Sequence, residues 1–265
     1  MTYDVDGTLL NSKKIITKKT KAAIENAIAE GKNIALSTGR GQAELRETYE
    51  ILPDLRYVVS YSGAHVLDRK ENKVIYSAAF DKSVAEKIFE VVKDKDIMIQ
   101  LLTATKSVVQ ADKLVDISRY GMTVYQESYD RIATPVDDIH EFFMTTEEPI
   151  YKINLYHRTH DERVITKEEL SGLDIETVFS EKTSVECSVK GVTKGVGVQK
   201  LAEYLGITMD EVISVGDADN DYDVLTKSGL AVAMANANDN IRGIADVLVT
   251  TNNYDGCAEA LRYYC

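Results

Sequence analysis

Short apolar segments alternate with amphipathic segments at both ends of this chain, and this rhythm limits the possible folds more than any other feature. Near the N-terminus an amphipathic segment begins at Thr17 and stops at Gly31, and an apolar run follows at 33–38. Thr17 is a favourable helix N-cap and Gly31 a typical helix stop. A second helical segment then leads to another apolar run at 56–60. This alternation predicts a Rossmann-like α/β core, in which helices cover both faces of a parallel sheet.

The same alternation returns near the C-terminus, after a long middle block with a different pattern. The elements expected there are a helix over 194–205, a strand over 212–215, a helix after Asp219 and a strand over 230–234. The middle block instead shows longer strands and few helices, which is typical of an α+β domain. We therefore predict a discontinuous core over 1–81 and 183–265, with an inserted α+β domain over 82–182.

Two acidic residues, Asp4 and Asp6, stand two positions apart at the end of the first apolar segment and precede Gly7 and Thr8. On an extended strand this spacing directs both side chains to the same side. Two converging carboxylates repel each other unless a divalent cation neutralises them, and ligation by oxygen alone suits Mg²⁺. Turn chemistry favours the same residues, so this motif by itself also fits a polar turn after a strand.

Three further polar clusters fall where predicted strands end or predicted helices begin. Ser37-Thr38-Gly39-Arg40 ends a strand and opens a helix, whose free N–H groups attract anions. Lys194 stands at the start of a helix, where a cation opposes the helix dipole. Four acidic residues follow the strand at 212–215, namely Asp217, Asp219, Asp221 and Asp223. Each cluster alone could be a helix cap, a surface lysine or a solvated loop, but open α/β sheets bind ligands at this edge.

In their order along the chain, these four clusters resemble the motifs of the haloacid dehalogenase-like superfamily, and more closely those of its Cof-type phosphatases. In these phosphatases a cap domain is inserted between the second and third motifs. The matching segments are Asp4 to Thr8, Thr38 to Arg40, Lys194, and Gly216 to Asp221. The segment Tyr61-Ser62-Gly63-Ala64 departs from the family in carrying Ser62 where asparagine is usual.

The resemblance implies a Mg²⁺-dependent phosphatase that hydrolyses small phosphorylated metabolites, such as sugar phosphates, through an aspartyl-phosphate on Asp4. It further implies that Asp6 acts first as general acid and then as general base, and that Lys194 and Thr38 stabilise the transferring phosphoryl group. The metal ligands implied by the resemblance are Asp4, Asp6, Asp217 and Asp221. The substrate contacts it implies are Gly39, Arg40, Ser62, Gly63 and Asn220.

Charge and cysteine content limit the possible partners and the cellular compartment. The formal charge is 31 − 43 = −12, which disfavours nucleic acid or an anionic membrane as a partner. Three widely spaced cysteines and the lack of a long apolar run predict a cytoplasmic protein without a disulfide framework or a zinc site. Two alternatives stay open: a sugar phosphomutase, which would carry the same motifs, and a phospho-receiver, which would leave the inserted domain unexplained.

Two other patterns point to different sites but are weaker. Gly195-x-Gly197 suggests dinucleotide binding, yet the third glycine of that motif is replaced by Lys200. His157-x-x-His160 could pair on a metal, but its place at the end of a predicted strand favours two solvated histidines.

Overall fold

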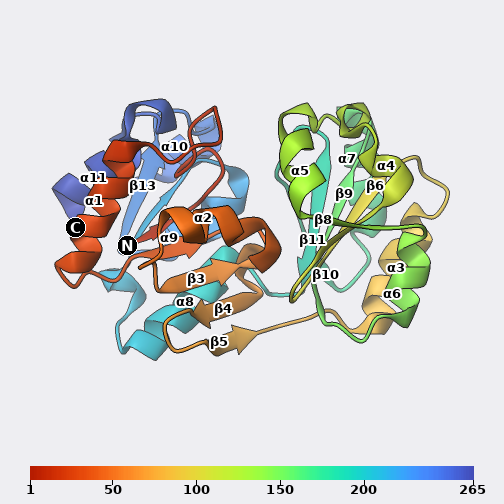
Figure 1. Ribbon diagram of the computed structural model, residues 1–265, viewed down its shortest axis with the longest axis horizontal. Coiled ribbons are helices and arrows are strands. Elements are labelled where there is room, and N and C mark those ends of the chain that lie inside the picture. The colour runs from red at the N-terminus through yellow and green to blue at the C-terminus, as the bar shows by residue number, and fades with distance from the viewer. The chain divides into compact units, whose positions relative to one another are not determined.

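The apolar runs at the two ends of the chain form one eight-stranded sheet in the computed structural model, which describes residues 1–265 (Figure 1). The strand order is β14-β13-β12-β1-β2-β3-β4-β5, and the strands from β14 through β3 run parallel. The last two strands, β4 and β5, continue the sheet as antiparallel neighbours. The strand bounds are β1 Thr2–Tyr3, β2 Ala35–Ser37, β3 Tyr57–Ser60, β4 His65–Asp68, β5 Lys73–Ser77, β12 Ile213–Gly216, β13 Leu230–Met234 and β14 Val247–Val249.

Helices cover both faces of this sheet, as the sequence predicts. Successive strand residues point to opposite faces, so Leu36 and Val58 pack in one apolar cluster with α1 and α11. Their neighbours Ala35 and Val59 pack in another, with α8 and α9. The helices are α1 Lys18–Ala29, α2 Arg46–Ile51, α8 Lys194–Leu205, α9 Tyr222–Lys227, α10 Asp239–Ile244 and α11 Gly256–Tyr264. The expected α/β class is therefore confirmed.

The middle of the chain forms a second sheet of six strands, in the order β10-β11-β9-β6-β7-β8. All neighbours are antiparallel except β7 and β8. Its strands are β6 Met98–Thr103, β7 Ser107–Gln110, β8 Ala133–Val136, β9 Ile150–Tyr156, β10 Ile175–Phe179 and β11 Ser184–Val189. Its helices are α3 Lys82–Val92, α4 Ala111–Leu114, α5 Gln126–Ile132, α6 Ile139–Thr145 and α7 His160–Leu170.

The two faces of this second sheet differ in polarity. Leu101 and Ile153 point to the face that packs against α3, α6 and α7. On the opposite face Gln100 accepts hydrogen bonds from Asn154 Nδ2 at 2.8 Å and from the Tyr156 hydroxyl at 3.0 Å. Alternation of apolar and polar residues along each strand thus gives the sheet one apolar side and one hydrogen-bonded side.

The chain separates into two compact units, which we call the core and the cap. The core comprises 1–40, 45–77 and 192–265, and the cap comprises 41–44 and 78–191. The sequence placed the boundaries at 81/82 and 182/183. The second division falls later along the chain because β11 pairs with β9 of the cap sheet, a partner that local sequence does not specify.

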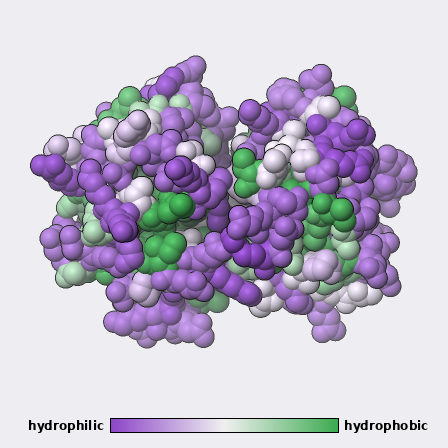
Figure 2. Space-filling model, turned by 45° about the horizontal axis from the view of Figure 1, so that its top comes forward, coloured by the Kyte–Doolittle hydropathy of each residue, from purple (hydrophilic) through white to green (hydrophobic).

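Most of the surface visible in Figure 2 is hydrophilic, and the hydrophobic residues there form small separate patches. None of the helices is both long enough and apolar enough to cross a membrane.

Candidate active site

Residues from separate motifs come together beyond the carboxyl ends of adjacent parallel strands in the core. Asp4 directly follows β1, Thr38 follows β2 and Asp217 follows β12, and these three strands are neighbours in the sheet. Lys194, the first residue of α8, reaches the same place and bonds to the carboxylates of Asp4 and Asp221. The sheet topology alone therefore gathers side chains that lie far apart in sequence.

Lys194 is buried between two carboxylates. Its Nζ lies 2.7 Å from Asp4 Oδ1 and 2.6 Å from Asp221 Oδ1, and all three residues are at most 5 % exposed. Burial alone would lower the pKa of the Lys194 ammonium, but the carboxylates of Asp221 and Asp4 raise it above its ordinary value. The amine therefore stays charged at the helix start, where the dipole would disfavour it, because two carboxylates neutralise it.

Three carboxylates form the one group of potential metal ligands. One oxygen from each of Asp4, Asp217 and Asp221 lies within 4.8 Å of the others. Burial raises the pKa of Asp4 well above its usual range; Lys194 opposes this shift, while Asp221 and Asp217 add to it. Burial, followed by the charge of Asp221, raises the pKa of Asp217 to about 7.

This group of ligands fits a divalent cation. When ionised, Asp4, Asp217 and Asp221 outnumber the single ammonium of Lys194, and a divalent cation would neutralise this surplus negative charge. Carboxylate oxygens are the ligands that Mg²⁺ prefers, whereas sulfur and imidazole donors are absent from the cluster. The residues present therefore fit the ion that the sequence implied.

Backbone geometry holds the carboxylates close together. Gly7 has φ +83°, and a Cβ atom there would overlap the carboxylate of Asp217. Asp217 Oδ1 accepts a 2.6 Å hydrogen bond from the Thr8 hydroxyl. Asp221 Oδ2 accepts hydrogen bonds from the backbone N–H groups of Asp217 at 3.0 Å and Ala218 at 3.2 Å. The Gly-Thr turn after Asp4 and the acidic loop after β12 therefore fit against each other only with glycine at position 7.

The carboxylate of Asp6 makes different contacts from those of the other three acids. Arg40 donates from Nε to Asp6 Oδ2 at 2.7 Å and from Nη2 to Oδ1 at 2.8 Å, and Lys14 Nζ donates to Oδ1 at 3.0 Å. Burial alone would raise the pKa of Asp6, but the charges of Arg40 and Lys14 hold it far below its usual range. Arg40, expected at the substrate, thus binds Asp6, and Lys14 is a partner that the sequence did not suggest.

The remaining expected site residues lie near this cluster but make local contacts. Thr38 is buried at the end of β2, and its hydroxyl accepts a 3.2 Å hydrogen bond from Arg40 N. Ser62 has φ 56° and Gly63 has φ +103°. A Cβ atom at Gly63 would overlap the carbonyl of Thr193, so this glycine lets the loop after β3 pack against the start of α8.

Gly39 and Asn220, two other expected substrate contacts, lie in the segments after β2 and β12. Gly39 lies in the same turn, between Thr38 and Arg40. Asn220 is half-buried, and its Oδ1 atom is shielded from solvent without a hydrogen-bond partner. A buried acceptor of this kind gains free energy from any donor that reaches it.

The histidine pattern does not form a metal site. His157 is fully buried, and its Nδ1 lies 3.0 Å from the carbonyl oxygen of Thr183, whereas His160 is exposed at the start of α7. The expectation of two solvated histidines is therefore wrong for His157. Its burial depends on the pairing of β9 with β11, which brings Thr183 beside it.

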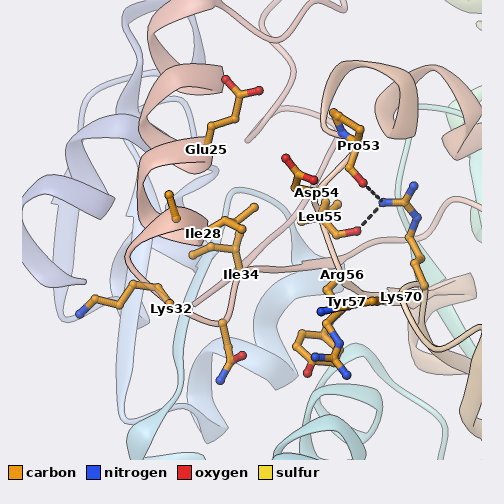
Figure 3. A pocket seen from close by; sticks show the side chains of 14 residues that line it. Glu25, Ile28, Lys32, Ile34, Pro53, Asp54, Leu55, Arg56, Tyr57 and Lys70 are labelled. Atoms are coloured by element: carbon orange, nitrogen blue, oxygen red, sulfur yellow. Dashed lines mark hydrogen bonds between the residues drawn. The ribbon is translucent and has the colours of Figure 1, made fainter.

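The large hollow of the core in Figure 3, about 770 Å³ in volume, lies at the other edge of the sheet. Its lining includes Ile34, just before β2, and Leu55 and Arg56, just before β3. These positions are the amino ends of strands whose carboxyl ends carry Thr38 and Ser62. None of the expected site residues lines this hollow.

The chain is similar to known proteins over nearly its whole length. A family model described as haloacid dehalogenase-like hydrolase matches residues 1–261. The 5-amino-6-(5-phospho-D-ribitylamino)uracil phosphatase YcsE of Bacillus subtilis (strain 168) is 27 % identical over 262 residues, which cover 98 % of this chain and 93 % of that protein. The chloroplastic endoribonuclease YBEY of Arabidopsis thaliana is 27 % identical over 274 residues, but this chain spans only 45 % of that protein's length.

A solved structure supports the same fold. A haloacid dehalogenase-like hydrolase from B. subtilis matches with a TM-score of 0.90 at 24 % sequence identity, covering 100 % of this chain and 99 % of that one. The likeness concerns the fold alone.

Proposed function

This chain belongs to the family of haloacid dehalogenase-like hydrolases, and we propose that it is a Mg²⁺-dependent phosphatase of small phosphorylated metabolites that works through an aspartyl-phosphate on Asp4. The observation that carries the proposal is the buried carboxylate of Asp4, bonded to Lys194 and grouped with Asp217 and Asp221. The proposed nucleophile, a cation and the proposed metal ligands therefore lie within one site. The YcsE relative, named as a phosphatase of a phosphorylated ribityl compound, supports a substrate of similar size.

Asp4 is the proposed nucleophile because one of its oxygens remains available. Lys194 donates to Oδ1, which leaves Oδ2 to attack phosphorus. As the bond from Oδ2 to phosphorus forms, the bond from phosphorus to the leaving oxygen breaks. Asp6 is ionised in the free site, so it must take up a proton when the anionic substrate binds beside it. This proton passes to the leaving oxygen, and the organic product departs as an alcohol.

In the second half-reaction a water molecule attacks the phosphorus of the aspartyl-phosphate. Asp6 takes a proton from this water, the bond from phosphorus to Asp4 breaks, and Asp4 returns as a carboxylate. Lys194 and the hydroxyl of Thr38 stabilise the phosphoryl oxygens as their charge redistributes. Each group thus acts on a stated atom, and the enzyme regains its starting state.

Asp4, Asp217 and Asp221, with the backbone carbonyl of Asp6, are the residues proposed to hold Mg²⁺. When bound, the ion supplies charge neutralisation that lets an anionic carboxylate approach an anionic phosphate. Gly39, Ser62, Gly63 and Asn220 are proposed to contact the substrate, and the buried acceptor of Asn220 suits a hydroxyl donor such as that of a sugar phosphate. All three cysteines are free, which fits a reducing cytosol.

The test is release of inorganic phosphate from a panel of sugar phosphates and related monoesters, with Mg²⁺ and with a chelator. We expect Mg²⁺-dependent release by the wild-type protein and none by Asp4→Asn, whose thermal unfolding should stay close to wild type. Asp54→Asn is a matched control, because Asp54 is exposed at the opposite edge of the sheet.

Two results would contradict the proposal. Equal phosphate release by Asp4→Asn would remove Asp4 as nucleophile. Isomerisation of a sugar phosphate that requires a bisphosphate activator and releases no phosphate would identify a phosphomutase instead.

A further inference from the structure

Lys14 is the cation at Asp6 that the mechanism above does not use. Its Nζ lies 3.0 Å from Asp6 Oδ1, and both side chains are about one-third exposed. We propose that Lys14 is a positioning residue, which together with Arg40 orients the Asp6 carboxylate for the hydrolysis of the aspartyl-phosphate. This inference rests on the proposed phosphatase function and assigns a role within that site.

The hydrogen bonds of Asp6 distinguish its two oxygens. Oδ1 accepts from both Lys14 Nζ and Arg40 Nη2, whereas Oδ2 accepts only from Arg40 Nε. A carboxylate oxygen offers about two lone-pair sites, so Oδ1 is saturated and Oδ2 retains one. We therefore assign Oδ2 as the atom that takes the proton from the attacking water. Lys14 occupies the second lone pair of Oδ1, so that Oδ1 cannot accept this proton.

Hydrogen bonds in the turn at 11–15 hold Lys14 in an unfavourable backbone conformation. Lys14 has φ 58°, in the left-handed region that residues other than glycine rarely adopt. The turn is closed by hydrogen bonds from Lys14 N to Asn11 O at 2.9 Å and from Asn11 N to Ile15 O at 3.1 Å. The Asn11 side-chain oxygen also accepts from the backbone N–H groups of Lys13 at 2.9 Å and Ile15 at 3.1 Å.

The same turn is hydrogen-bonded to Asn252 and Asn253, in the segment between β14 and α11. Asn253 Oδ1 accepts hydrogen bonds from Ser12 N at 3.1 Å and Ser12 Oγ at 2.8 Å. Asn252 Nδ2 donates to Leu10 O at 2.9 Å. A surface lysine needs neither a strained backbone nor such anchoring, since its side chain could reach many carboxylates. These observations together indicate that the place of the Lys14 amine is specified by the fold.

The step that depends on this orientation can be isolated with a suitable leaving group. With p-nitrophenyl phosphate the phenolate leaves without a proton, so formation of the aspartyl-phosphate does not need Asp6. Its breakdown still does, because the attacking water must lose a proton to Oδ2 as the bond from phosphorus to Asp4 breaks. A misplaced Asp6 should therefore slow the second half-reaction alone.

The experiment is rapid-mixing kinetics of nitrophenol release from p-nitrophenyl phosphate with Mg²⁺, with acid quenching to measure the phosphorylated fraction. For Lys14→Met we expect the steady-state rate to fall by about 10- to 100-fold, the scale seen when a catalytic group is misplaced. A burst of nitrophenol should appear, with a burst rate within about twofold of wild type because the first step is untouched. Lys14→Arg should restore most of the rate, since it retains the donor.

Three further variants separate positioning from other effects. Lys13→Met, at the exposed neighbouring position, should match wild type. Asn11→Ala should reproduce the burst, because it loosens the turn while the amine of Lys14 remains. In an Asp6→Asn background, Lys14→Met should change the rate by less than about twofold, since two residues that act through one group are not additive.

The inference is overturned if Lys14→Met keeps the wild-type steady-state rate, if it slows the burst as much as the steady state, or if its effect persists in the Asp6→Asn background. Failure of the underlying function gives a different result. In that case the wild-type protein releases no nitrophenol and Asp6→Asn accumulates no phosphorylated protein.

Discussion

Replacing Lys194 by methionine should destabilise the core strongly, and to an extent that depends on pH. The change keeps the apolar stem of the side chain but removes the ammonium that bonds to Asp4 at 2.7 Å and to Asp221 at 2.6 Å. The side chains involved are at most 5 % exposed, so water cannot replace the lost partner without opening the site. Two carboxylates would then face each other without a cation.

The loss in free energy of unfolding depends on how many ion pairs are broken and on the interactions that Asp4 and Asp221 retain. Removing one partner of a buried ion pair typically costs about 3–5 kcal/mol. Two pairs are broken here, but Asp221 keeps its two backbone donors and Asp4 can take up a proton. We therefore expect about 3–5 kcal/mol in total rather than twice that amount. For a chain of this size this corresponds to a fall in Tm of about 6–20 °C.

The loss of stability in Lys194→Met should increase with pH. Burial already raises the pKa of Asp4, and raises that of Asp217 to about 7, while Lys194 opposes both shifts. Without Lys194 both pKa values rise further. A carboxyl group whose pKa is raised in the folded state contributes stability at low pH that is lost as the pH rises through that pKa. The stability deficit of Lys194→Met should therefore be larger at pH 8 than at pH 6.

The assay is thermal and urea unfolding of the full chain at both pH values, without added metal. Lys200→Met is the matched control on the same helix, because the Lys200 side chain pairs with Glu203 at the surface, and no measurable change is expected. If Lys194→Met unfolds like Lys200→Met at pH 8, or if its deficit grows as the pH falls, the buried charge pairs do not stabilise the core as argued.

Two other outcomes follow from the geometry of the acidic cluster. Gly7→Ala should destabilise the protein by about 1–3 kcal/mol, because position 7 has a positive φ. The added Cβ should also displace the Asp217 carboxylate and lower the Mg²⁺ affinity measured by calorimetric titration. Gly172→Ala is the control: Gly172 has open space around it, so neither stability nor Mg²⁺ affinity should change. A Gly7→Ala protein with wild-type stability and Mg²⁺ affinity would refute the overlap. Because the pKa of Asp217 is raised to about 7, protons should compete with Mg²⁺ for its carboxylate below that pH. The Mg²⁺ affinity should therefore rise between pH 6 and pH 8, and this rise should be smaller in Asp217→Asn. Affinity that is constant or falls over this interval in the wild-type protein would contradict this view.

The parts of the site that the sequence predicts are those specified by local pattern. Helical periodicity and the stop at Gly206 place Lys194 at the start of α8, and the misfit of its charge with the helix dipole marks it as unusual. Strand ends likewise place Asp4, Thr38 and Asp217 at one edge of the sheet. These inferences need only the period of each segment and the topology of parallel sheets.

The contacts that the sequence does not predict depend on residues brought together by the fold. Alternation along an extended strand predicts that the Asp6 side chain points to the same side as that of Asp4. In the structure the Asp6 carboxylate is instead bound by Arg40 and Lys14. The backbone of Lys14 adopts a left-handed conformation in a turn where the Asn11 side chain accepts a hydrogen bond from Lys13 N, and the period of a helix or strand does not reveal such a turn. The assignment of β11 to the cap and the burial of His157 depend similarly on strand pairing between distant segments.

The position of Asp4 has a consequence for how the protein folds. Asp4 lies 190 residues from Lys194, and its backbone N–H donates to the carbonyl of Val215 at 3.0 Å. The strand before it, β1, has only two residues and is held by neighbours on both sides. During synthesis the segment that carries Asp4 must therefore wait, without its β12 partner, until the whole cap has been made. Contacts of such long range fold slowly. The candidate active site is thus among the last parts of the core to take shape, because Asp4 needs β12, which is made only after the whole cap.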